Sequence, residues 1–190
     1  MEQTLLAEHL ETLREDLAYH QLRVLLLVVA VAGSEGHSRK LDGLTKLAKL
    51  DFLLRYPGLS PTVLEKLDPQ DSRLHLGEHP SLASTDVEAP MTRYRYGPWD
   101  DRYYPIIGAL VGRGLVRYVK GRKGSVALSP TPAGKKIAAE IRTSSAWHFT
   151  FDRSLAIAEA SAGLTGNTLK NLIYDRLPAL MDRPHRELIK

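Results

Sequence analysis

The first part of the chain follows helical periodicity over three stretches. Leucines at intervals of three and four residues, separated by acidic residues, predict an amphipathic helix with an acidic outer face over residues 2–18. Residues 20–32 are apolar on all sides, which predicts a helix at the centre of the core. A third helix is predicted over about residues 40–56, where apolar residues form a broad surface, and Pro57 and Gly58 end it.

Helical periodicity then fades over a segment that is predicted to be mostly loop. Ser60 and Pro61 are residues that begin helices, so they predict a short helix that reaches about Leu67. Residues 68–90 are rich in proline, serine, aspartate and histidine and show no apolar period, which predicts a long loop.

Turn and cap residues predict a helix soon after this loop. Gly97 and Pro98 predict a turn, and Asp100 and Asp101 are residues that start helices and suit their positive amino ends. Gly114 is a typical carboxyl cap for the same helix. The predicted inward face of this helix consists of Ile106, Ile107, Leu110 and Val111.

A β-hairpin and a further helix are predicted next. Residues 115–119 and 125–128 favour strands, and the basic, glycine-rich segment 120–124 joins them as a hairpin tip. Thr131 and Pro132 supply a cap and a first-turn proline for the following helix. A helix, a hairpin and a helix in this order form the second half of a winged helix, and the apolar helices before them supply the first half.

Two more helices are predicted beyond residue 143, divided by Gly163 and Leu164, with Thr165 capping the second. A winged helix does not need them, so they either pack against the N-terminal helix or form a docking surface for another chain. The predicted fold is therefore α+β and mostly α, a winged helix with helical extensions. Its parts are an N-terminal helix (1–19), a winged-helix domain (20–143) with a loop insertion at about 68–90, and a C-terminal helical extension (144–190).

Composition narrows the classes of protein to consider. Of the 190 residues, 43% are hydrophobic and 25% are charged, which suffices for a sizeable core. The absence of cysteine excludes disulfides, thiolate nucleophiles, zinc fingers and iron–sulfur clusters. The longest apolar run, Val24 to Ala32, has nine residues, whereas a bilayer span needs roughly 20. We therefore expect a cytoplasmic protein that does not engage a membrane.

Charge is unevenly distributed along the chain. The formal net charge is +4, but residues 1–90 carry −5, residues 91–142 carry +8 and residues 143–190 carry +1. A basic segment in an otherwise acidic chain indicates an acidic partner, either nucleic acid or an acidic protein surface. Arginines and lysines alternate with aromatic residues in this segment. The residues expected to contact nucleic-acid phosphates are Arg93, Arg95, Arg117, Lys120, Arg122 and Lys123.

The outward face of the helix before the hairpin argues against reading of DNA sequence. It carries proline, alanine and glycine, and none of these can make a bidentate contact to a base edge. Small residues four positions apart instead permit close approach of another backbone. This disfavours a sequence-specific repressor and predicts a docking surface for a partner protein. The residues expected to line it are Trp99, Arg102, Gly108, Ala109, Gly112 and Arg113.

Motifs of enzymes are weak or incomplete in this sequence. The segment His75 to His79 has the spacing of an inverted zinc-protease motif, but Gly77 within it and Pro80 after it disfavour the necessary helix. The hairpin tip lacks the spacing of a nucleotide-binding loop, and Asp100 beside Asp101 is better explained by helix capping than by acid–base chemistry. We expect no enzymatic activity, and no catalytic, cofactor-binding or metal-binding set.

Two blocks of sequence resemble a known protein family. They are KLDGLTKLAKLDFLLRYP (40–57) and APMTRYRYGPWDDRYYPIIGALVGRGLV (89–116). Both resemble the winged-helix middle components of bacterial three-component systems, built around an ABC-type ATPase of the structural-maintenance-of-chromosomes (SMC) or Rad50 kind. These systems are the Lamassu-type defence group. A Tyr-Gly-Pro-aromatic turn before a winged-helix helix, as at residues 96–99, also occurs in the Panacea antitoxin family.

The resemblance implies an adaptor without catalysis. Such a subunit sits between the DNA-sensing ATPase and a toxic effector, such as a nuclease, in a complex directed against phages or plasmids. Contact with double-stranded DNA would then be non-specific. Two alternatives stay open, a winged-helix transcriptional regulator and an antitoxin that neutralises one toxin without an ATPase. The genes beside this one would distinguish the three.

Overall fold

The computed structural model describes residues 16–75 and 90–189, and its fold is α+β and mostly helical. The helices are α2 (Leu17–Gly33), α3 (Leu44–Arg55), α4 (Ser60–Val63), α5 (Ser72–His75), α6 (Tyr103–Gly112), α7 (Pro132–Ile141), α8 (His148–Ala160), α9 (Gly166–Arg176) and α10 (Pro178–Met181). The strands are β1 (Met91–Tyr94), β2 (Gly97–Trp99), β3 (Val116–Lys120), β4 (Val126–Pro130) and β5 (Leu188–Ile189). Short 3₁₀ turns lie at Pro57–Leu59 and Arg122–Gly124.

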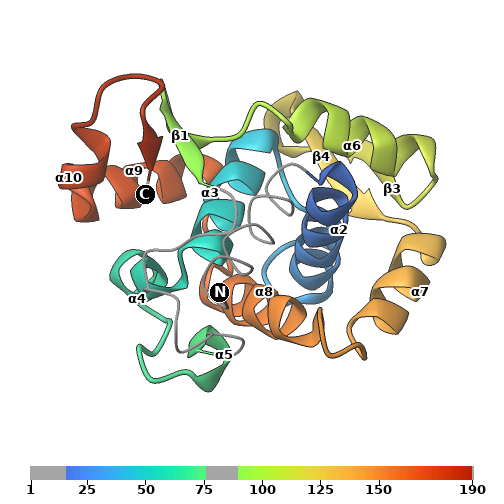
Figure 1. The fold of residues 1–190 in the computed structure, drawn as a ribbon. Helices are drawn as coiled ribbons and strands as arrows, with labels where there is room; N and C mark the ends of the chain where they lie inside the picture. The colour runs from blue at the N-terminus through green and yellow to red at the C-terminus, as the bar shows by residue number, and fades with distance from the viewer. Residues whose placement is uncertain (1–15, 76–89, 190) are drawn as a thin grey trace, which may run out of the picture.

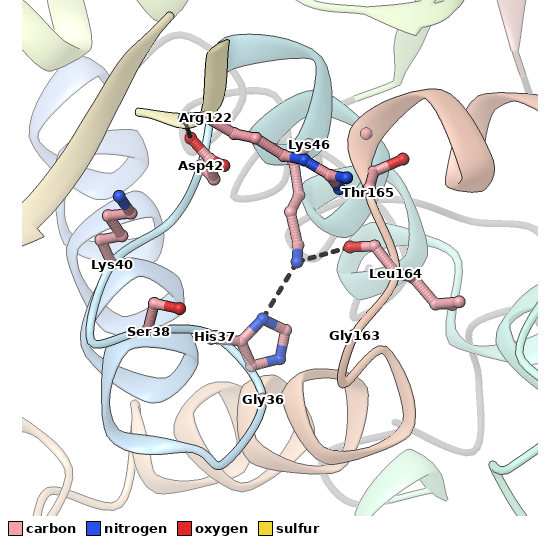
Figure 2. Close-up of a pocket in the computed structure, with 11 residues that line it drawn as sticks. Gly36, His37, Ser38, Lys40, Asp42, Lys46, Arg122, Gly163, Leu164 and Thr165 are labelled. Carbon is pink, nitrogen blue, oxygen red and sulfur yellow. Dashed lines mark hydrogen bonds between the residues drawn. The ribbon is translucent and has the colours of Figure 1, made fainter. Parts of the chain in front are cut away.

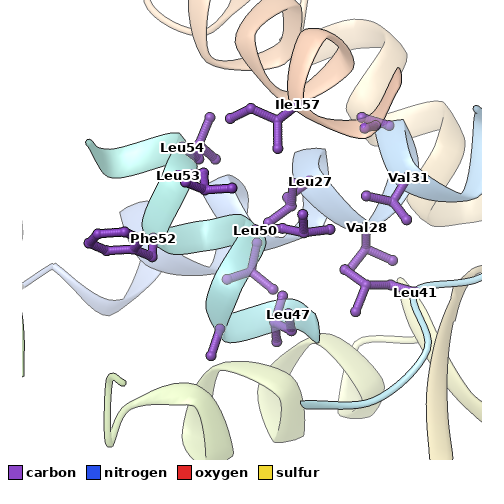
Figure 3. Packing of buried hydrophobic residues seen from close by; sticks show 14 of the residues in the cluster. Leu27, Val28, Val31, Leu41, Leu47, Leu50, Phe52, Leu53, Leu54 and Ile157 are labelled. Atoms are coloured by element: carbon purple, nitrogen blue, oxygen red, sulfur yellow. The ribbon is translucent and has the colours of Figure 1, made fainter. Parts of the chain in front are cut away.

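Helix α2 forms the centre of the molecule, as its long apolar run from Val24 to Ala32 predicts. It packs against α6, α7, α8 and β4, and α3 packs against α8 and α9 (Figure 1). Leu27 and Val31 of α2 lie in one apolar cluster with Leu50 of α3 and Ile157 of α8, and all four are fully buried (Figure 3). The helices that follow residue 143 therefore complete the core.

The predicted order of helix, hairpin and helix is present, as α6, the β3–β4 hairpin and α7. Strands β3 and β4 pair antiparallel from Val116 opposite Pro130 to Lys120 opposite Val126. A third segment joins this sheet, because the backbone of Leu41 exchanges two hydrogen bonds with Leu128 of β4. The predicted helix caps at Thr131 and Thr165 are also present. Their hydroxyls accept hydrogen bonds from backbone amides in the first turns of α7 and α9, respectively.

A second, three-stranded sheet was not predicted. Its order is β2–β1–β5, and Met91 at the start of β1 lies opposite Ile189 near the carboxyl end. The prediction of a turn at Gly97 and Pro98 is wrong, because both residues belong to β2 and the turn occupies the two residues before them. Gly97 has a φ of +92°, a conformation that strongly favours glycine inside or outside a turn.

The predicted helix start at Asp100 and Asp101 also needs correction. Helix α6 begins at Tyr103, and no side chain caps it. Asp100 is buried and forms ion pairs with Arg55 and Arg102. Its carboxylate also accepts from the backbone amide of Arg102 at 3.0 Å, directly before α6, but two guanidinium groups supply most of its hydrogen bonds.

Other predicted boundaries shift by a few residues. Helix α2 begins at Leu17, where Asp16 caps it, and most of the predicted helix 2–18 lies outside the described residues. The predicted short helix ends at Val63, and α5 lies within the predicted loop 68–90. Among the described residues, no helix is long and apolar enough to cross a membrane.

Candidate functional site

The β3–β4 hairpin presents four of the six residues predicted to contact phosphates. Their side chains are exposed or partly so, and they are Arg117, Lys120, Arg122 and Lys123. The tip folds back on the segment before α3, where the carboxylate of Asp42 accepts a bond of 2.9 Å from the backbone of Arg122. A Cβ on Gly121 would lie only 2.5 Å from the same carboxylate, so glycine permits this close approach.

The other two predicted phosphate contacts lie in a different part of the molecule. Arg93 and Arg95 flank the end of β1, which lies apart from the β3–β4 hairpin (Figure 1). The guanidinium of Arg93 donates to the carbonyl of Met181 at 3.0 Å and lies over the ring of Tyr174. Arg93 therefore holds β1 against the C-terminal helices, while Arg95 is exposed.

Helix α6 has the orientation that its sequence predicts. Ile106, Ile107 and Leu110 are buried, whereas Gly108 and Gly112 are exposed and a Cβ on either would meet nothing within 4 Å. The small-residue face, Gly108, Ala109 and Gly112, is thus open to a partner. That a partner occupies it stays a prediction.

The larger residues predicted to flank this face are held by the fold. Arg102 pairs with Asp100 at 2.7 Å, and Arg113 donates to the side chain of Gln21 at 3.0 Å. The indole of Trp99 donates to Asp101 at 3.0 Å. These contacts fix the three side chains in place, so the edges of the small-residue face are rigid.

An aromatic row runs from the segment before β5 toward α6. The rings of His185 and Tyr94 lie 5.1 Å apart, those of Tyr94 and Trp99 6.1 Å, and those of Trp99 and Tyr104 6.2 Å. Tyr104 is 66% exposed. Exposed aromatic side chains beside a rigid face are typical of protein interfaces. His185 was missed in the sequence, because it lies far along the chain from its neighbours in the row.

A buried charge cluster lies beneath α6. The carboxylate of Asp51 accepts from Arg23 at 2.9 Å, from Arg55 at 2.6 Å and from the hydroxyl of Tyr103 at 2.7 Å. Burial alone would raise the pKa of Asp51, but the charges of Arg23 and Arg55 outweigh it, and the pKa lies well below its ordinary value. The cluster joins α2, α3 and α6 and has no access to a substrate.

Family models, curated proteins and solved structures gave no match to this chain.

Groups that could hold a metal are absent from the described part of the chain, where no three histidine, aspartate or glutamate side chains converge. His75 of the zinc-protease-like motif is described, and its ring nitrogen lies 3.0 Å from the carbonyl of Pro69. The rest of that motif, Leu76 to His79, lies outside the described residues.

Proposed function

We propose that this protein is a cytoplasmic, non-catalytic winged-helix adaptor in a bacterial defence complex. One of its surfaces would hold an ATPase of the SMC or Rad50 kind, and another would hold a toxic effector such as a nuclease. The observation that carries the proposal is the open small-residue face of α6 beside the aromatic row, since it suits a protein partner and offers no group that reads bases.

The order of elements supports a winged helix. Helix α2, the bridge at Leu41, α3, α6 and the β3–β4 hairpin follow one another in the order of that fold. Leu41 pairs with β4 at the position of the first strand of a three-stranded wing sheet. On this interpretation α6 is the helix that a DNA-binding relative would place in the major groove.

The two blocks that resemble the adaptor family lie against each other. The ammonium group of Lys49 in the first block donates to the carbonyl of Pro98 in the second at 3.0 Å. Arg55 pairs with Asp100 at 2.8 Å, and the backbone of Met91 donates to the hydroxyl of Tyr56 at 3.0 Å. Residues that form one packed unit are the kind that a family shares, which supports the resemblance.

Contact with DNA fits the hairpin better than α6. The small-residue face of α6 offers no side chain that can bond to a base edge, whereas the four hairpin cations reach solvent. Such a surface binds phosphates without regard to sequence. We propose that any DNA bound by the adaptor is held in this way.

A bulky substitution on α6 tests the docking surface. Gly112→Trp places an indole where a Cβ meets nothing within 4 Å, so the protein should fold with unchanged thermal stability. The proposed complex with an ATPase should weaken by at least tenfold, because a close-packed interface cannot admit the indole. Gly58→Trp is the control: its Cβ also meets nothing within 4 Å, and it lies in the turn before α4, away from α6.

Co-purification and titration calorimetry measure the outcome. Normal binding by a folded Gly112→Trp protein would exclude this face as the docking site. The C-terminal helices around Leu169, Leu172 and Ile173 were the alternative expected from the sequence, but Leu169 and Ile173 are fully buried in the core, so only the outer surface of these helices could then dock a partner. Tight, salt-resistant binding to one operator sequence would favour the transcriptional regulator instead. Neutralisation of a neighbouring toxin without any ATPase would favour the antitoxin.

A further inference from the structure

A hollow of about 160 Å³ lies where the hairpin tip meets the loop after α2 and the turn between α8 and α9. Figure 2 shows the side chains around it. Three cationic side chains, Lys40, Lys46 and Arg122, line it together with His37. His37, Lys40 and Lys46 come from one stretch of the chain, whereas Arg122 comes from the distant hairpin tip, and a single carboxylate, that of Asp42, lies among them.

Lys46 is the most deeply placed of these cations. Only 5% of it is exposed, and its ammonium group lies at the middle of the hollow (Figure 2). It donates to the carbonyl of Leu164 at 2.7 Å and contacts Nδ1 of His37 at 3.0 Å. Burial lowers the pKa of Lys46 to about 8, and the charge of Asp42 offsets only part of this.

His37 is held as a neutral acceptor for Lys46. Its Nε2 lies 2.7 Å from the carbonyl of Ala158, which can only accept, so Nε2 carries the proton. Nδ1 is then left with a lone pair that faces Lys46. Burial also lowers the pKa of His37. Both polar partners of the buried ammonium are therefore neutral.

The amino ends of α3 and α9 meet at the backbone of Lys46. A Cβ on Gly166, the first residue of α9, would lie 2.8 Å from the backbone nitrogen of Lys46 in the first turn of α3. Gly43 precedes α3 and offers no side-chain cap. Helices of 11 and 12 residues thus direct their positive ends to the same place, which adds to the attraction for an anion.

Arg122 closes the hollow from the hairpin. Its side chain extends over Lys46 toward Thr165 (Figure 2). Two hydrogen bonds hold the backbone of Arg122 in place: its amide donates to the carboxylate of Asp42, and its carbonyl accepts from the hydroxyl of Ser125. Its guanidinium is thus placed to donate two hydrogen bonds to a bound oxyanion.

We propose that this hollow binds a phosphate group, with Lys46 and Arg122 as its cationic ligands. A phosphate has enough oxygens to accept from the ammonium, the guanidinium and a backbone amide at once, whereas a carboxylate has two. The ligand would be a phosphorylated small molecule or the terminal phosphate of a nucleic acid. The site needs no ATPase and does not depend on the docking surface proposed for α6.

Titration calorimetry of the full chain with inorganic phosphate at pH 8 tests the site. Arg122→Ala and Lys46→Met should each weaken binding at least tenfold, the latter keeping the apolar stem of the lysine. Arg117→Ala is the matched control, because it removes one exposed cation from the same hairpin without lining the hollow. An equal loss in Arg117→Ala and Arg122→Ala, or no binding at millimolar phosphate, would overturn the proposal.

Proton uptake tests the role of Lys46 separately. Sulfate does not titrate near pH 8, so its binding heat should differ between buffers of different ionisation enthalpy only if the protein takes up a proton. Uptake should occur in the native chain, because a bound anion raises the pKa of Lys46 from about 8. His37, with its lowered pKa, stays neutral. The other charged groups that line the hollow are Lys40, Arg122 and Asp42. Proton uptake that persists unchanged in Lys46→Met, or sulfate binding that is as tight in Lys46→Met as in the native chain, would overturn the assignment of Lys46 as a ligand.

Competition experiments identify the source of the phosphate. A nucleic-acid end predicts that a 5′-phosphorylated oligonucleotide binds more tightly than its 5′-hydroxyl counterpart, and that Arg122→Ala abolishes the difference. A small-molecule ligand predicts that a mononucleotide displaces inorganic phosphate, while the two oligonucleotides bind alike. Gly112→Trp should leave phosphate binding unchanged, so failure of the docking surface and failure of this site are distinguishable.

Discussion

The two ends of α3 bury charge in opposite ways. Near its carboxyl end, Asp51 and Arg55 belong to a cluster in which every buried carboxylate meets at least two guanidinium groups. Near its amino end, Lys46 is buried against a carbonyl and a neutral imidazole. One helix thus carries buried charges that are paired with opposite charges near its carboxyl end, and a buried cation with neutral partners near its amino end.

The difference separates structural charge from charge that is available to a ligand. A buried ion pair with all its hydrogen bonds satisfied has nothing left to offer, and it fixes the elements that supply it. By contrast, the charged form of a buried cation with neutral partners is stabilised when an anion binds in a hollow beside it. Lys49 lies between these cases, since it is 1% exposed and donates to the carbonyl of Pro98, but it does not line the hollow.

Removal of the charge of Asp51, near the carboxyl end of α3, should have the largest effect on stability. Asp51→Asn removes the charge that Arg23 and Arg55 share and leaves two buried guanidinium groups without their common partner. We expect a loss of about 3–5 kcal/mol in the free energy of unfolding, measured by urea denaturation. Asp101→Asn, at an exposed carboxylate close by, should change it by less than about 0.5 kcal/mol. A similar small change in Asp51→Asn would contradict a structural role for the cluster.

Lys49 should make stability depend on pH. Its pKa is lowered to about 7 by burial and by the charge of Lys170, against 10.5 for a lysine in water. The unfolded chain therefore binds more protons than the folded chain between these values, and the free energy of unfolding should rise with pH from about 7 to 10.5.

Replacing this lysine tests that assignment. Lys49→Met should stabilise the protein at pH 7 and lower the slope of the free energy of unfolding against pH by about 1.4 kcal/mol per pH unit at its steepest. Lys46, whose pKa is about 8, keeps its own contribution to the rise. Urea denaturation at several pH values measures it, and Lys66→Met, at an exposed lysine, is the control. An unchanged slope in Lys49→Met would show that this amine keeps its ordinary pKa in the folded protein.

Much of the fold follows from local signals in the sequence. The apolar run of α2, the caps at Thr131 and Thr165, and the basic hairpin tip each depend on residues a few positions apart. The inward face of α6 is likewise set by helical spacing alone. Such features were predictable because their causes are local.

The parts that were missed depend on contacts between distant segments. Strand β5 pairs with β1 almost a hundred residues away, and no turn signal announces that pairing. The hollow joins His37, Lys46 and Arg122, and no signal in the sequence indicates that these three residues meet. Asp51 did carry a signal, since an aspartate on an apolar helix face needs a buried partner, but the sequence did not identify the partner.

The smallest expected effect concerns the hairpin and DNA. Arg122 extends over the hollow, while Lys123 beside it lies at the exposed tip. Replacing both by alanine should weaken binding of duplex DNA equally for all sequences and flatten the slope of log affinity against log salt by about one to two units. Lys135→Ala with Lys136→Ala, two exposed cations on α7 outside the hairpin, is the matched control. Fluorescence anisotropy at several salt concentrations measures both pairs.

If the α7 pair flattens the slope as much as the hairpin pair, DNA is attracted by the overall charge of the molecule. If only the hairpin pair does so, the tip is the contact, and single substitutions then divide the effect between the residue that covers the hollow and the one that does not.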